Sequence, residues 1–186
     1  MTNRHSTPQA RAEVYANVLF DSSNAADGVN GVVGARNELL EILDTLNSNV
    51  DARALIASND TEFETKKKFI SILCEGKGEV ASTVFSNAVE NGDFGILKVV
   101  LRLLEDKISE NLKVCIVDVT SAVELDDHLR DLVKEKAKRE LGLDAILNEK
   151  IDKNILGGVI LSVNGKCIDA SMITQLNRAR DVLKAS

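Results

Sequence analysis

Apolar residues recur at helical spacing along the first hundred residues of the chain. The helix predicted to begin at Thr7-Pro8 carries two neighbouring apolar stripes. One is Ala12, Tyr15, Ala16 and Leu19; the other is Val14 and Val18. Threonine before proline is typical of a helix start. A surface helix needs only one stripe to contact its core, so the second indicates deep burial or a docking face.

Four further helical patterns follow, over 35–46, 50–57, 79–90 and a segment that a Thr61–Glu64 capping box precedes. Residues 79–90 again carry two stripes, which contain Ala81, Phe85 and Val89, and Val80, Val84 and Ala88. Residues 94–108, with Asp93 as the expected cap, are apolar on nearly every side, which predicts a central helix. Glycines at 28, 31 and 34 predict a loop over 21–34. The whole predicts a bundle of about six helices.

The pattern changes after the polar segment 105–113. Short apolar runs at 114–119, 145–150 and 159–163 predict strands, with helices over 126–141 and 171–184. Asn164-Gly165 between two such runs is a strong hairpin signal, since both residues tolerate positive φ. We therefore expect a mainly α protein: a helical bundle domain at 1–108 and a small α+β domain with a β-hairpin at 109–186.

Composition and charge narrow the possible functions. Aromatic residues are 3% of the chain and tryptophan is absent, so the core is expected to be aliphatic. The net charge of −6, with acidic residues around the only lysine run at 66–68, argues against a nucleic-acid partner. No apolar run approaches the roughly 18 residues of a membrane span, and the N-terminus lacks the apolar stretch of a signal peptide. We expect a cytosolic protein that reaches a membrane only through a partner.

The chain offers few residues for catalysis, for a cofactor or for a metal. The spacing of Gly28, Gly31 and Gly34 is not that of a dinucleotide site, and no strand precedes it. Gly157-Gly158 leads into a strand rather than a helix, so no helix N-terminus is offered to a phosphate. The pair instead predicts a bulge or a close backbone approach.

Cysteine and histidine are equally uninformative. Cys74, Cys115 and Cys167 lack metal spacing, and Cys167 has no marked base among His5 and His128. The cysteines are interpreted as small buried hydrophobes. We predict no catalytic residue, no cofactor and no metal.

The C-terminal sequence VDVTSAVELDDHLRDLVKEKAKRELG, followed by ILNEKIDKNILGGVILSVNGKCIDASMITQLNRARDVL, closely resembles the δ subunit of rotary ATP synthases. The mitochondrial member of that family is the oligomycin-sensitivity-conferring protein. Matching motif positions are Ile151, Asp152, Leu156, Gly157, Gly158, Val159, Asp169, Ser171 and Leu176, and all of these except Ile151 and Val159 are taken as structural. Ala170 and Ile173 depart from the family pattern.

The N-terminal part resembles the same family more weakly. ARAEVYANVLF matches its first helix through Tyr15, Ala16, Leu19 and Phe20, and AVENGDFGIL matches a later segment through Glu90, Asn91, Gly92 and Leu97. The motifs fall in the family's order, so the resemblance extends over essentially the whole chain.

The resemblance implies a non-catalytic peripheral-stalk (stator) subunit of a proton-translocating ATP synthase, present as one copy per complex. In this family the helical domain holds the N-terminal helix of an α subunit in a groove between its first and fifth helices. The two helices with double stripes would line that groove, with Tyr15, Val18, Leu19, Val84 and Ala88 as candidates. Each candidate could equally fill the bundle core.

The second domain would bind the b subunits of the peripheral stalk. The expected place is the cytoplasmic face of a bacterial membrane, through the complex alone. Two other hypotheses stay open from the residues: a cysteine-dependent enzyme that uses Cys167 or Cys115, and a generic helical adaptor. The reactivity of the thiols in the folded protein would test the enzyme hypothesis. The identity of the protein that co-purifies with the chain would test the adaptor hypothesis.

Overall fold

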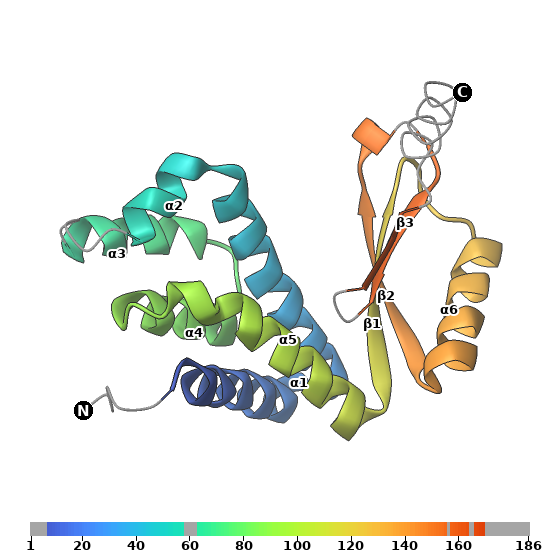
Figure 1. Cartoon of the computed structure of the whole chain (residues 1–186), viewed down its shortest axis with the longest axis horizontal. Helices are drawn as coiled ribbons and strands as arrows, with labels where there is room; N and C mark the ends of the chain where they lie inside the picture. The colour runs from blue at the N-terminus through green and yellow to red at the C-terminus, as the bar shows by residue number, and fades with distance from the viewer. Residues whose placement is uncertain (1–6, 58–62, 156, 164–165, 170–186) are drawn as a thin grey trace, which may run out of the picture. The chain divides into compact units, whose positions relative to one another are not determined.

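The computed structural model describes residues 7–57, 63–155, 157–163 and 166–169 (Figure 1). The chain divides into two compact units, residues 1–107 and 108–186. Among these described residues the first unit holds five α-helices and the second a sheet with a covering helix, which confirms the mainly α fold with a small α+β part. Each unit is described by itself.

The first helix, α1 (Pro8–Ser48), begins as the sequence predicts. The Thr7 hydroxyl accepts a hydrogen bond from the Ala10 amide at 3.3 Å, and Pro8 occupies the first turn. The loop predicted over 21–34 is wrong. Helix continues through this segment except at Asp27 and Gly28, whose dihedral angles form a kink between two helical parts.

Two of the three glycines in this segment serve the kink. Gly28 has φ 55° and ψ −136°, a conformation that essentially only glycine adopts. At Gly31 a Cβ would lie 2.3 Å from the Ser23 carbonyl oxygen, whereas at Gly34 it would meet nothing within 4 Å. The kink therefore requires glycine at 28 and 31, and nothing in its surroundings requires glycine at 34.

The glycine positions give a matched pair of variants. Gly31→Ala should lower the free energy of unfolding by about 1–3 kcal/mol, because the methyl group overlaps the Ser23 carbonyl. Gly34→Ala should leave it unchanged or raise it by up to about 1 kcal/mol through helix propensity. Urea denaturation followed by circular dichroism measures both. Equal stability of the two variants would contradict the assigned close approach.

The remaining helices of the first unit lie close to their predicted ranges. They are α2 (Val50–Ala57), α3 (Phe63–Leu73), α4 (Glu79–Glu90) and α5 (Leu97–Lys107), with the 3-10 turn η1 (Phe94–Ile96) before α5. Thr61, half of the predicted capping box, lies outside the described residues. Helix α1 packs against both α4 and α5 (Figure 1). The largest fully buried side chains are aliphatic apart from Phe85: Leu19, Val32, Leu39, Ile42, Leu46, Leu97, Val100 and Leu104.

The sequence predicts that α5 is central to the bundle, with apolar residues on nearly every side. In the structure only one face of this helix is buried. Leu97, Val100 and Leu104 are buried, but Val99 on another face is exposed. The helix therefore contributes one face to the bundle core, and the polar residues between its apolar positions keep the rest in contact with water.

A buried ion pair crosses the bundle from α1 to α5. The Arg36 Nε donates to the Glu105 Oε1 at 3.0 Å, and a second guanidinium nitrogen of Arg36 contacts the same oxygen. Arg36 also donates to the Asn37 Oδ1 at 3.1 Å, and its side chain is 5% exposed. Such a pair is costly to break on one side only, because the remaining charge stays buried.

Replacing one member of this ion pair should destabilise the bundle more than replacing both members. Arg36→Met removes the guanidinium that donates to the buried Glu105 carboxylate and should lower the free energy of unfolding by about 3–5 kcal/mol. The double variant Arg36→Met/Glu105→Leu should recover a large part of that loss. Urea denaturation of both single variants and the double variant completes the cycle. Additive losses would show that the two side chains do not interact.

The second unit is built around the strand β1 (Val114–Ser121), which follows the π-helical turn η2 (Ile108–Leu112). Helix α6 (Asp127–Leu141) connects β1 to the parallel strand β2 (Asp144–Ile151). The 3-10 turn η3 (Lys153–Ile155) then leads to β3 (Val159–Val163) and β4 (Lys166–Asp169). The sheet order is β2-β1-β3-β4, with β3 antiparallel to both neighbours.

These elements confirm the strand and helix pattern predicted after 113. Asp126 caps α6 through a 2.7 Å bond from the Leu129 amide, and Gly142 ends it with φ 70°. The polar segment 105–113 is helical up to Leu112, in α5 and η2. Val163 pairs with Lys166, which confirms the hairpin, while Asn164-Gly165 and the helix predicted over 171–184 lie outside the described residues.

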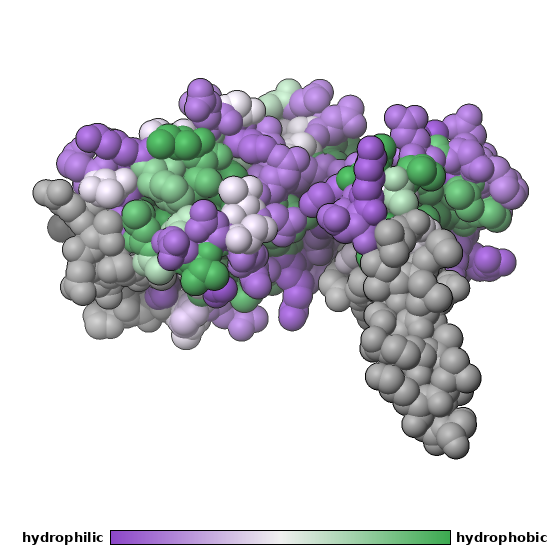
Figure 2. Space-filling model, turned by 90° about the horizontal axis from the view of Figure 1, so that it is seen from above, coloured by the Kyte–Doolittle hydropathy of each residue, from purple (hydrophilic) through white to green (hydrophobic). Residues whose placement is uncertain are grey.

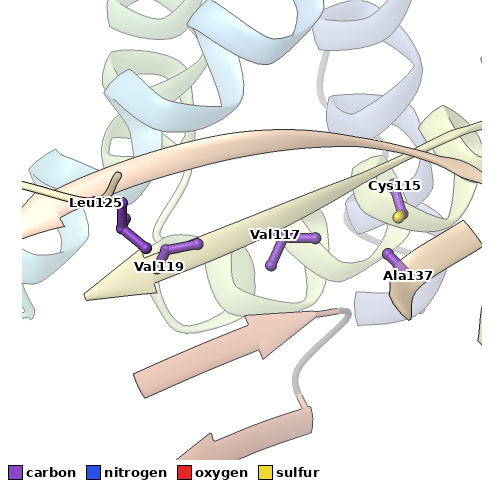
Figure 3. Close-up of a cluster of buried hydrophobic side chains, with 5 residues drawn as sticks. All are labelled: Cys115, Val117, Val119, Leu125 and Ala137. Atoms are coloured by element: carbon purple, nitrogen blue, oxygen red, sulfur yellow. The ribbon is translucent and has the colours of Figure 1, made fainter. Parts of the chain in front are cut away.

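The core of the second unit lies between β1 and α6. Cys115, Val117 and Val119 point from one face of β1, and Leu125 and Ala137 complete the buried cluster (Figure 3). Alternation along β1 explains this arrangement, because every second side chain of a strand faces the same side. The cysteine thus occupies a position that any small apolar side chain would fill.

Candidate protein-interaction surfaces

The five residues predicted to line a groove separate into two groups. Leu19, Val84 and Ala88 are buried inside the first unit, with Val84 2% exposed. Val18 is 46% exposed, and Tyr15 is partly buried. The buried three fill the bundle core in this chain by itself. The described surface therefore offers Val18 and, in part, Tyr15 to another molecule.

The double apolar stripes predicted for α1 and α4 differ in how far they are buried. On α4, Ala81, Phe85 and Val89 are buried together with Val84 and Ala88, so the two stripes form one broad core face. On α1, the stripe of Ala12, Ala16 and Leu19 is buried, but Val14 and Val18 are 60% and 46% exposed. The excess apolar face predicted for both helices remains available on α1 alone. Apolar groups are exposed among polar ones on the surface of both units (Figure 2).

A cluster of polar side chains borders the exposed valines. The Asp93 carboxylate accepts two bonds from the Arg11 Nε, at 2.9 and 3.1 Å, and one from the Tyr15 hydroxyl at 3.3 Å. The Asn91 amide donates to the Tyr15 hydroxyl at 3.2 Å. Asp93 was expected to cap the following helix, and this is wrong, because its side chain makes no capping bond there. Its carboxylate is directed to α1 instead.

Burial raises the pKa of the Tyr15 hydroxyl, and the neighbouring Asp93 charge raises it further. The hydrogen bond from Asn91 acts in the opposite direction, and the net shift of the pKa is upward. The phenol is therefore neutral throughout the physiological range, and it donates to Asp93 as the geometry requires.

The polar cluster and the exposed valines share one side of α1. Residues 11, 14, 15 and 18 are spaced i, i+3, i+4 and i+7, which places them along a single ridge of a helix. Arg11 and Tyr15 contact Asp93 in the segment between α4 and α5, while Val14 and Val18 are exposed beside them on the same ridge. The arrangement is an apolar stripe with a fixed polar edge, suited to the apolar face of another helix.

Two of the motif positions of the second unit, Asp152 and Gly158, shape local turns. The Asp152 amide donates to the Ser121 carbonyl at 2.8 Å, and its carboxylate accepts from the Asn154 amide at 2.9 Å, which forms the turn after β2. Gly158 has φ 81°, a left-handed conformation that favours glycine, so the pair precedes β3 as a bend. Asp169 pairs with Ile160 in the sheet, while Leu156, Ser171 and Leu176 lie outside the described residues.

The second unit exposes apolar side chains that the sequence did not assign to an interface. They gather on α6, on the segment before it and at the end of β2: Val123, Leu129, Leu132, Leu141 and Ile151. Leu129 and Leu132 belong to the helical pattern that predicted α6, but periodicity alone did not distinguish its covered face from its open one.

Sites for other chemistry are not found in the part of the chain that the structure describes. His, Cys, Asp and Glu form no group of three that could hold a metal within those residues. Among the described helices, none combines the length and apolar character needed to cross a membrane. Cys115 is buried, and burial raises the pKa of its thiol. A raised thiol pKa lowers the thiolate fraction, which opposes a nucleophilic role.

Cys115 should accordingly resist alkylation in the folded protein. Iodoacetamide at pH 8 should modify it slowly without denaturant and rapidly in 6–8 M urea, about the range that unfolds small domains. Mass spectrometry of peptides separates this cysteine from Cys74 and Cys167. Rapid modification of Cys115 in the folded chain would favour the cysteine-enzyme hypothesis.

Comparison with known proteins identifies the family to which this architecture corresponds. The family model described as "ATP synthase delta (OSCP) subunit" matches residues 12–183. ATP synthase subunit delta of Limosilactobacillus reuteri is 25% identical over 173 residues, which cover 92% of this chain and 94% of that protein. The subunit delta of Prochlorococcus marinus strain MIT 9312 is 31% identical over 144 residues, with 76% and 80% covered.

A solved structure shares the fold. A chain in the cryo-EM structure of the Toxoplasma gondii mitochondrial ATP synthase hexamer superposes with a TM-score of 0.53 at 17% sequence identity. The match covers 94% of this chain and 98% of the other. Both units of the molecule therefore have counterparts in one known chain.

Proposed function

The chain belongs to the ATP synthase delta (OSCP) subunit family, and on that premise we propose that it is a non-catalytic stator subunit linking the catalytic head to the b-subunit stalk. The observation that carries this function is the family match, which runs from residue 12 to residue 183 through both units. The chain is a peripheral-stalk subunit of an ATP synthase and assembles with other subunits of that complex. Its work is mechanical: it holds the head still while the rotor turns.

The first unit, residues 1–108 in our proposed division, would bind the N-terminal helix of an α subunit. The exposed stripe of Val14 and Val18 supports this, because an amphipathic helix buries its apolar face on such a surface. Leu19, Val84 and Ala88 would support the stripe from beneath as core residues. Tyr15 would contribute its ring at the edge.

The second unit, residues 109–186, would bind the b subunits. Its exposed apolar residues on α6 and at the end of β2 support a second interface separate in sequence from the first. We place the assembled chain at the cytoplasmic face of a bacterial membrane, held there through the complex, with one copy per catalytic head.

Aspartate substitutions in the exposed stripe test the first interface. Val14→Asp and Val18→Asp should each weaken binding of an α-subunit N-terminal peptide by about tenfold or more, since a charge would replace a buried apolar contact. Titration calorimetry with the full chain measures the affinity. The double variant should also fail to retain the head when the tagged chain is purified from membranes.

Val50→Asp is the matched control for that experiment. Val50 is 78% exposed at the first position of α2, where an acidic residue suits the helix N-terminus. It should bind the peptide as the unaltered chain does. Val84→Asp cannot serve as a test of binding, because a carboxylate at this buried position would destabilise the bundle. If both stripe variants bind the peptide with unchanged affinity, the stripe is not part of the interface. If the catalytic head does not co-purify with the unaltered tagged chain, the stator function is overturned.

A further inference from the structure

Asp93 lies where the end of α4 meets the start of η1 and is 5% exposed. Its amide donates to the Ala88 carbonyl at 2.7 Å, which fixes the residue to α4. Its carboxylate accepts from Arg11 and Tyr15, which lie 82 and 78 residues earlier in the chain. A buried carboxylate that receives a guanidinium and a phenol restricts both partners in direction as well as distance.

The first part of α1 needs such a restriction. The buried side chains of this part are Ala12, Ala16, Leu19 and Ser23, and three of these four are small. Small side chains allow helices to approach closely but interdigitate little, so they define rotation about the helix axis weakly. The kink at Asp27 and Gly28 also separates this part from the second part of α1, which Arg36 and Glu105 anchor to α5.

Rotation of this part of the helix would move the exposed stripe directly. Arg11, Val14, Tyr15 and Val18 form one ridge, so the two bonded residues and the two exposed valines move together. A rotation by one residue corresponds to about 100° around the helix, which would turn the exposed valines by the same angle.

We propose that Asp93 is a positioning residue of the docking surface: through Arg11 and Tyr15 it sets the rotation of the first part of α1 and so presents Val14 and Val18 to the partner helix. This rests on the proposed function of the stripe. Asp93 itself need not contact the partner. The inference concerns how the surface is held in place, which neither the family match nor the exposure of the valines specifies.

The test compares two carboxylate-to-amide substitutions. Asp93→Asn keeps the shape of the side chain but removes the charge that receives Arg11, and it should weaken binding of the α-subunit N-terminal peptide by about tenfold. Glu105→Gln makes the same change in the other ion pair between α1 and the bundle, beyond the kink. It should lower the unfolding midpoint in urea yet leave the peptide affinity of the folded chain unchanged. Arg11→Gln provides a second variant of the Asp93 pair, with the same expected loss of affinity.

Tyr15 supplies an independent readout, since it is the one tyrosine of the chain and tryptophan is absent. Phenolate absorbance therefore reports this residue alone. Loss of the Asp93 charge should lower the pKa of Tyr15, whereas Glu105→Gln should leave its titration unchanged.

Two results would overturn the proposal. One is a lowered Tyr15 pKa in Asp93→Asn with unchanged peptide affinity. The other is an equal loss of affinity in Glu105→Gln and Asp93→Asn, which would reduce the effect to general destabilisation. If instead the unaltered chain fails to bind the peptide, the proposed function of the stripe fails, and that result is distinct from both.

Discussion

The close packing of α1 against α4 and α5 is the constraint on which the first unit depends. It buries the small residues of the first part of α1 and the leucines of its second part. Two carboxylates, Asp93 and Glu105, secure the two parts to the bundle on either side of the kink. The apolar core supplies most of the stabilisation, and these polar bonds determine which of several similar packings is adopted. Val14 and Val18 remain exposed because other residues of α1 form its buried face.

Much of this architecture could be predicted from the order of apolar residues. Helical spacing located α2 to α6, and β-branched runs located the strands, because burial of one face imposes a period on the sequence. The loop predicted at 21–34 failed because glycine was taken as a helix breaker. At Gly31 it is the only residue that fits the close approach to the Ser23 carbonyl across the kink, and the spacing of apolar residues does not reveal that kink.

The candidate surface was less predictable than the fold. A second apolar stripe shows that a helix face has more to bury, but it does not show whether the same chain or a partner covers it. On α4 the chain itself covers Val84 and Ala88, and on α1 it leaves Val14 and Val18 open. The Asp93 cluster joins residues about eighty positions apart, a pairing that no local pattern contains. Among the residues that carried the family resemblance, Asp152 and Gly158 shape turns on either side of η3.

The position of β1 in the sheet has a consequence for a protein that must resist torque. The chain reaches the second unit through η2 and continues at once into β1, which is hydrogen-bonded to β2 on one side and β3 on the other. Removing this strand from the sheet therefore requires the hydrogen bonds to both β2 and β3 to break. A strand at the edge of the sheet, peeled from one end, would give way under a smaller force.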